Sequence, residues 1–105
     1  MMSKVYNKLV RDRIPEIIIA AGNEPVTRTA GDDEYEQLLK AKLAEEVDEF
    51  LTGDYPEELA DILEVLKAAA RAKGITWEQI EAMAVEKKAK RGGFEDKIVL
   101  VEVKG

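Results

Sequence analysis

The sequence contains no cysteine and no histidine among its 105 residues. Without cysteine there are no disulfides, no thiolate zinc sites and no cysteine nucleophile. Without histidine the commonest general base and metal ligand is missing as well. Any chemistry that this chain performs must therefore depend on carboxylates, lysines and arginines.

Long apolar runs and an excess of positive charge are also missing. The longest apolar stretch, residues 17–21, is far too short to span a bilayer, so we expect a cytoplasmic protein without a membrane partner. The net charge of −6 argues against binding to a nucleic acid polymer, because affinity for the phosphate backbone depends on a basic surface. With 46% hydrophobic and 36% charged residues, the chain is expected to form a single domain over residues 1–105.

Apolar periodicity and helix stop signals predict the secondary structure. Asp32 or Asp33 is expected to cap the longest helix, and Thr76 with Gln79 forms a capping-box pattern at the start of the last one. The first helix is nearly all apolar and is expected to be buried. The four predicted helices cover residues 13–21, 32–52, 56–73 and 77–91.

The end of the sequence has a different pattern. Residues 98–103 are rich in β-branched side chains and predict a short strand, for which Val5 and Tyr6 are candidate partners. The predicted fold class is therefore all-α: a helical bundle of about four helices, built on an antiparallel helical hairpin, with a short terminal β segment.

Four carboxylates lie symmetrically about the turn between the second and third predicted helices: Glu46, Glu49, Glu58 and Asp61. An antiparallel hairpin with its pivot between residues 53 and 54 places Glu49 level with Glu58, and Glu46 level with Asp61. Each pair spans roughly 4.5 Å along its helix, and packed helices lie about 8–10 Å apart. The four groups can therefore converge on one small volume and form a cage for a hard divalent cation.

A solvated acidic face is the alternative interpretation, since most Glu-rich helices have one. Periodicity argues against it. Glu46 falls within an apolar stripe of its helix and Glu49 on the flank of that stripe, while Glu58 falls within the apolar sector of the next helix and Asp61 at its edge. Carboxylates on a buried face need protons, basic partners or a metal ion, so we favour a functional site.

Basic residues gather at two places in the chain. Near the start are Lys8, Arg11 and Arg13, and at the end of the fourth predicted helix Lys87 and Arg91 lie on its apolar side. Compensation of the helix dipole explains the second cluster equally well. Beside an acidic cage, however, such cations suit phosphate groups, and a carboxylate-bound metal with basic groups nearby is the arrangement for metal-assisted phosphoanhydride hydrolysis.

The E-x-x-E and E-x-x-D pairs on adjacent helices resemble the motif of the all-α nucleoside triphosphate pyrophosphohydrolases, which include the MazG-type enzymes, the dimeric dUTPases and phosphoribosyl-ATP pyrophosphohydrolase. The opening sequence NKLVRDRIP (residues 7–15) and the pattern of Lys87 followed by RGGF (residues 91–94) are similar to a MazG-like subfamily described as phosphoribosyl-ATP pyrophosphohydrolase-like. The resemblance covers nearly the whole chain.

This resemblance implies hydrolysis of a nucleoside triphosphate, or a related nucleotide, to a monophosphate and pyrophosphate. It implies Mg²⁺, with Mn²⁺ as an alternative, bound by the four carboxylates, and it gives a catalytic role on water to one carboxylate, with Glu46 and Glu49 as the candidates. The two basic clusters would hold phosphate oxygens, and a homodimer or homotetramer is expected. A nucleotide-binding module without turnover and a purely structural helical oligomer remain as alternatives.

Overall fold

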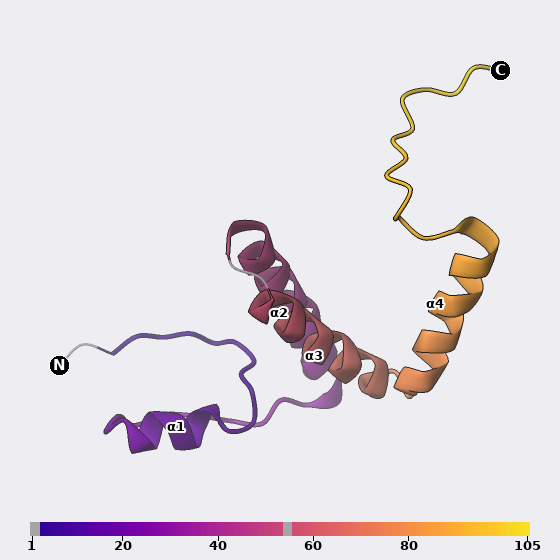
Figure 1. Ribbon diagram of the computed structural model, residues 1–105. Helices are drawn as coiled ribbons and strands as arrows, with labels where there is room; N and C mark the ends of the chain where they lie inside the picture. The colour runs from indigo at the N-terminus through magenta and orange to yellow at the C-terminus, as the bar shows by residue number, and fades with distance from the viewer. Residues whose placement is uncertain (1–2, 54–55) are drawn as a thin grey trace.

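The computed structural model describes residues 3–53 and 56–105 of the chain. Within these residues the protein is an all-α helical bundle whose centre is a hairpin of two antiparallel helices (Figure 1). Residues 54 and 55, where the sequence places one side of the hairpin pivot, lie outside the described residues. The helices are α1 (Ile14–Ala20), α2 (Asp32–Thr52), α3 (Glu57–Ala72) and α4 (Trp77–Arg91).

The helix boundaries agree closely with the predicted ranges. The capping box at the start of α4 is confirmed, because Gln79 N–H donates to the Thr76 hydroxyl at 3.1 Å and Thr76 N–H donates to the Gln79 side chain at 2.9 Å. The predicted cap of α2 is wrong. Its N-cap is Gly31, and Asp32 and Asp33 instead lie in the first turn, where their charges face the positive end of the helix dipole.

The core lies between α2 and α3, where Leu39, Val65 and Ala70 are buried. Helix α4 packs against α3, and the Lys67 ammonium lies 5.9 Å from the centre of the Trp77 ring at this junction. From there α4 leads away from the hairpin, as Figure 1 shows. The first helix, α1, contains no buried residue, so the prediction that it is buried is wrong for this single chain.

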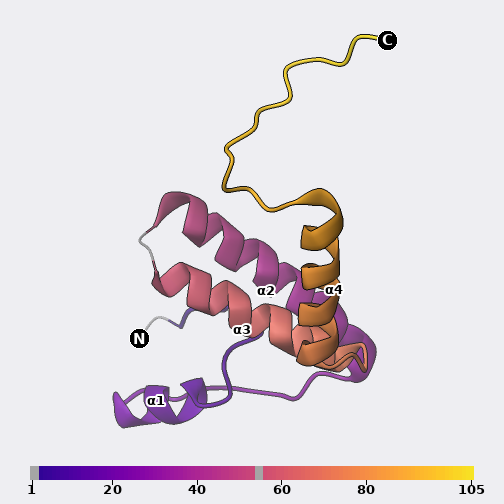
Figure 2. The ribbon, with the colours of Figure 1, turned by 45° about the vertical axis from the view of Figure 1, so that its right-hand side comes forward.

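The predicted β segment is not formed: no strand occurs within residues 3–53 and 56–105. Residues 98–103 are extended, and their apolar side chains are about four-fifths exposed. A strand requires a second strand beside it. The N-terminal segment, which contains the candidate partner, lies on the other side of the hairpin from this tail, as Figures 1 and 2 show.

Within the described part of the chain, each helix is too short or too polar to span a membrane.

Candidate functional site

The hairpin brings together carboxylates from both of its helices. One oxygen each from Glu46 and Glu49 of α2 and Asp61 of α3 lie within 4.8 Å of one another, and we call these three residues the acidic cluster. The i, i+3 spacing places both α2 members on one face, and the antiparallel packing of α3 brings Asp61 to them. The expected convergence is therefore seen for three of the four candidate ligands.

Glu46 is the buried member of the acidic cluster, with only 7% of its surface exposed. Its Oε1 lies 3.4 Å from the Lys42 ammonium, whereas its Oε2 is buried with no hydrogen-bond partner in the described structure. Burial raises the pKa of the Glu46 carboxyl above its ordinary value of 4.5, and so do a hydrogen bond with Glu49 and the charges of Glu49 and Asp61, while Lys42 opposes them. The site therefore favours either a proton or an added cation at Glu46.

Lys42 is a member of this site that the sequence analysis missed. Its side chain is 16% exposed, and its ammonium contacts Glu45 at 3.5 Å as well as Glu46. The signal was present, because residues four apart on a helix are neighbours and Lys42 lies one turn before Glu46.

Glu58, the fourth candidate ligand, lies beside the acidic cluster and is not grouped with it. A Cβ atom added at Gly53 would lie 2.8 Å from Glu58 Oε1 and 2.5 Å from the Glu49 carbonyl oxygen, so only glycine allows this approach. Glu58 Oε2 is buried and, like Glu46 Oε2, has no hydrogen-bond partner among the described residues. The hairpin thus presents two unpaired carboxylate oxygens close to its turn.

The first basic cluster divides between the site and the surface. Arg11 donates to Asp61 Oδ1 at 2.6 Å, and Lys8 donates to Glu45 Oε1 at 2.8 Å. The hydrogen bond between Lys8 and Glu45 lowers the pKa of the Glu45 carboxyl and raises the pKa of the Lys8 ammonium. Arg13, the N-cap residue of α1, instead pairs with Glu16 of that helix at 3.4 Å, so it does not reach the acidic cluster.

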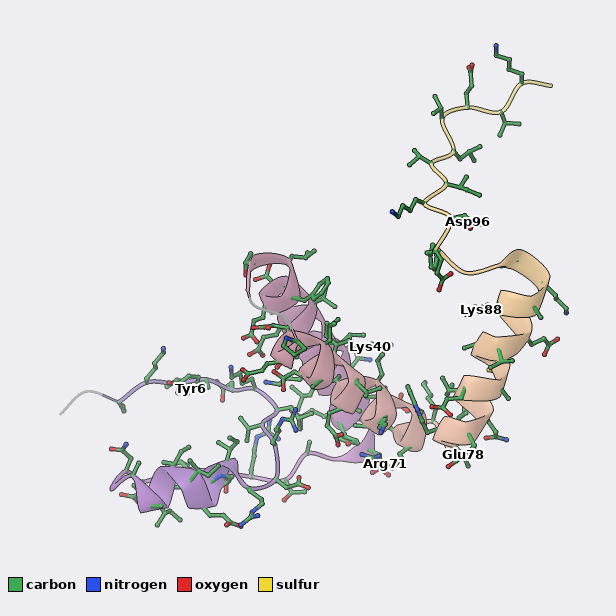
Figure 3. All side chains as sticks on the ribbon, in the orientation of Figure 1. Tyr6, Lys40, Arg71, Glu78, Lys88 and Asp96 are labelled. Atoms are coloured by element: carbon green, nitrogen blue, oxygen red, sulfur yellow. The ribbon has the colours of Figure 1, made fainter. Side chains whose placement is uncertain are left out.

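The second basic cluster lies on α4. Lys87 and Arg91 border a shallow hollow of about 230 Å³ together with Met83, Glu86 and Lys90. Figure 3 shows Lys88, in the same part of α4, well away from the hairpin. Since α4 packs at the end of α3 opposite the turn, one chain does not bring Lys87 and Arg91 to the acidic cluster.

Over 47 residues the chain is 60% identical to an uncharacterized protein of Mycolicibacterium smegmatis. This match covers 45% of the chain and 48% of that protein, so it spans about half the length of the relative. No family model and no solved structure matches the chain.

The chemistry of the site follows from its donors. Carboxylate oxygens are the ligands that hard divalent cations prefer, and here they converge from two helices that the hairpin packs together. Lys42 and Arg11 offset part of the negative charge, but Glu46 Oε2 has no partner among the described residues. An additional cation or a proton would satisfy that oxygen.

Proposed function

We propose that the protein is a metal-dependent nucleoside triphosphate pyrophosphohydrolase, which converts a nucleoside triphosphate or a related nucleotide to a monophosphate and pyrophosphate. The observation that supports this proposal is the acidic cluster, with its buried Glu46 and the unpaired Oε2 of that residue. Acidic residues on exposed helix faces are common, but a buried carboxylate oxygen without a partner is costly and needs a reason.

The residues present fit a hard divalent cation. Glu46, Glu49 and Asp61 would hold Mg²⁺ or Mn²⁺, and Glu58, whose Oε1 lies against Gly53 at the turn, is the proposed fourth ligand. When bound, such an ion polarises phosphate oxygens and lowers the pKa of a coordinated water.

The protein residues have separate roles in this proposal. Glu49 is exposed, and one of its carboxylate oxygens lies within 4.8 Å of one from the buried Glu46. Either carboxylate can orient a water molecule and accept its proton. Arg11, which contacts Asp61 of the cluster, is the proposed partner of phosphate oxygens, while Lys8 holds the same segment to Glu45 and Arg13 pairs with Glu16.

Lys87 and Arg91 contribute to such a site through a second copy of the chain. Apolar side chains on the hairpin support this homodimer or homotetramer, since Leu59 and Leu63 of α3 are more than two-fifths exposed and Leu51 of α2 is 72% exposed. In the proposed assembly, the α4 helix of one copy lies beside the hairpin of another. The proposed setting is the cytoplasm.

A structural helical oligomer is the second candidate, and one observation favours it. Lys42 and Arg11 already pair with members of the acidic cluster, as expected if the acids only form ion pairs. The two candidates differ in their response to metal ions. A true site stabilises the fold by mass action when Mg²⁺ is added, whereas a set of ion pairs is only screened by it.

The deciding experiment assays a panel of nucleoside triphosphates for pyrophosphate release with Mg²⁺. The test variant is Glu49→Gln, and the matched control is Asp48→Asn on the preceding residue of α2, which is exposed and outside the acidic cluster. We expect the wild type and the control to be active and Glu49→Gln to be inactive. Activity that survives a chelator, or release of diphosphate and orthophosphate, would rule out the proposed reaction.

A further inference from the structure

The N-terminal segment, residues 3–13, is tied to both helices of the hairpin. Lys8 pairs with Glu45 of α2 and Arg11 pairs with Asp61 of α3, at sequence separations of 37 and 50 residues. The two cationic groups differ in their partners, because Asp61 belongs to the acidic cluster and Glu45 does not. Lys8 therefore anchors the segment beside the site, and Arg11 occupies a member of the site itself.

We propose that Arg11 is a resident cation of the acidic cluster, which an incoming divalent metal ion displaces from Asp61, and that the displaced guanidinium then pairs with the phosphates of the substrate. This inference rests on the proposed function. It assigns to Arg11 two successive partners, and to Lys8 the constant role of holding the segment in place.

The local charges support an exchange. Without a metal ion, Arg11 and Lys42 face three carboxylates, so the cluster keeps an excess of negative charge. A divalent cation added beside both of them would reverse that excess, and it would need oxygens that Arg11 now engages. Release of Arg11 removes both conflicts and leaves Lys42, which its helix position fixes next to Glu46, in place.

The exposure of the two partners shows that the exchange is feasible. The Arg11 side chain is 56% exposed and that of Asp61 is 38% exposed, so solvent screens their attraction. A guanidinium is also well suited to bind phosphate through two parallel hydrogen bonds. Because Lys8 remains bound to Glu45, a freed Arg11 stays within reach of a phosphate chain at the cluster.

The test uses two measurements on the full chain. Calorimetry with Mg²⁺ should show tighter binding in Arg11→Gln by about two- to fivefold, the change expected on removing a weak surface ion pair. Arg13→Gln is the matched control, since it makes the same substitution in the same segment at an arginine that pairs with Glu16 and not with the acidic cluster, and its affinity for Mg²⁺ should be unchanged. Nuclear magnetic resonance of the arginine Nε–H groups should show the Arg11 signal shifting with Mg²⁺ while the Arg13 signal stays constant.

A triphosphate analogue with a non-hydrolysable bridge should then move the Arg11 signal again, and the absence of this second shift would refute the phosphate contact. If Mg²⁺ binds, pyrophosphate is released and the Arg11 signal and affinity do not respond, the exchange is wrong and the proposed function stands. If Arg11 responds but pyrophosphate is never released, the exchange stands and the proposed reaction is wrong. If Mg²⁺ does not bind at all, both fail.

Discussion

Replacement of Glu46 by glutamine should stabilise the metal-free protein. Glu46 is buried, its carboxyl lies among other carboxyls, and its Oε2 has no partner in the described structure. A buried, unsatisfied polar group costs about 1–3 kcal/mol. An amide removes the charge, and its NH₂ group can donate to the Glu49 or Asp61 carboxylate.

The substitution also weakens one favourable contact. The attraction between Glu46 and Lys42 at 3.4 Å is weakened, at a cost of about 0.2–1 kcal/mol, because Lys42 keeps its ion pair with Glu45 and the amide oxygen can still accept its hydrogen bond. The net gain in the free energy of unfolding is then about 1 kcal/mol, which corresponds to a rise in Tm of about 4–8 °C for a domain of this size.

The assay is thermal unfolding at neutral pH in the presence of a chelator. Glu45→Gln is the matched control on the adjacent residue. The Glu45 carboxylate accepts hydrogen bonds from Lys8 and Lys42, which lower its pKa, so its loss should destabilise the chain slightly. Opposite signs for two neighbouring Glu→Gln changes are the expected result, and a lower Tm for Glu46→Gln, or equal effects of the two, would refute the reasoning.

The dependence on pH provides a second check of the same prediction. Because the pKa of Glu46 is raised in the folded chain, the folded state holds this proton more tightly than the unfolded state does. The contribution of Glu46 to stability is thus complete below the unfolded value near 4.5 and is lost as pH rises through the raised folded value. The Glu46→Gln variant should lack this decline, which denaturant titrations at several pH values would reveal.

Three further predictions concern phosphate binding, reaction class and α4. Lys87→Ala or Arg91→Ala should lower kcat/KM by an amount equivalent to about 1.5–3 kcal/mol without changing the affinity for Mg²⁺, as measured by steady-state kinetics and calorimetry. Lys88→Ala, outside the hollow on α4, should have a mild effect, and a greater loss in this variant would contradict the assignment. Mg²⁺ and Mn²⁺ should both support one-step formation of monophosphate and pyrophosphate, and Ca²⁺ should do so poorly because it takes a larger and looser coordination shell. Anion-exchange analysis of the products made with each ion tests this, and equal rates with Ca²⁺ would argue against it. Thr76→Ala removes the cap of α4 and should lower the free energy of unfolding by about 1 kcal/mol in denaturant titrations. Thr76→Ser keeps the hydroxyl and should be nearly neutral, and an equal loss in both variants would show that the hydroxyl is not the stabilising group.

The sequence by itself determined the helices and the α2 part of the site. Helix ends depend on groups a few residues apart, such as Thr76 and Gln79, so their positions follow from local pattern. The same short range places Glu46 and Glu49 on one face of α2, and the symmetry of the carboxylates about the turn predicted that Asp61 lies opposite them.

The tertiary structure alone decided which distant groups meet. Local pattern cannot show that Arg11 binds Asp61 across 50 residues, that Glu58 lies against Gly53 outside the acidic cluster, or that α4 leads away from the hairpin. These outcomes depend on the angles at which the helices pack and on the paths of the connecting segments, which no periodicity specifies. The tail over residues 98–103 shows the same limit, since β-branched residues favour an extended backbone but a strand forms only where the fold brings a second one beside it.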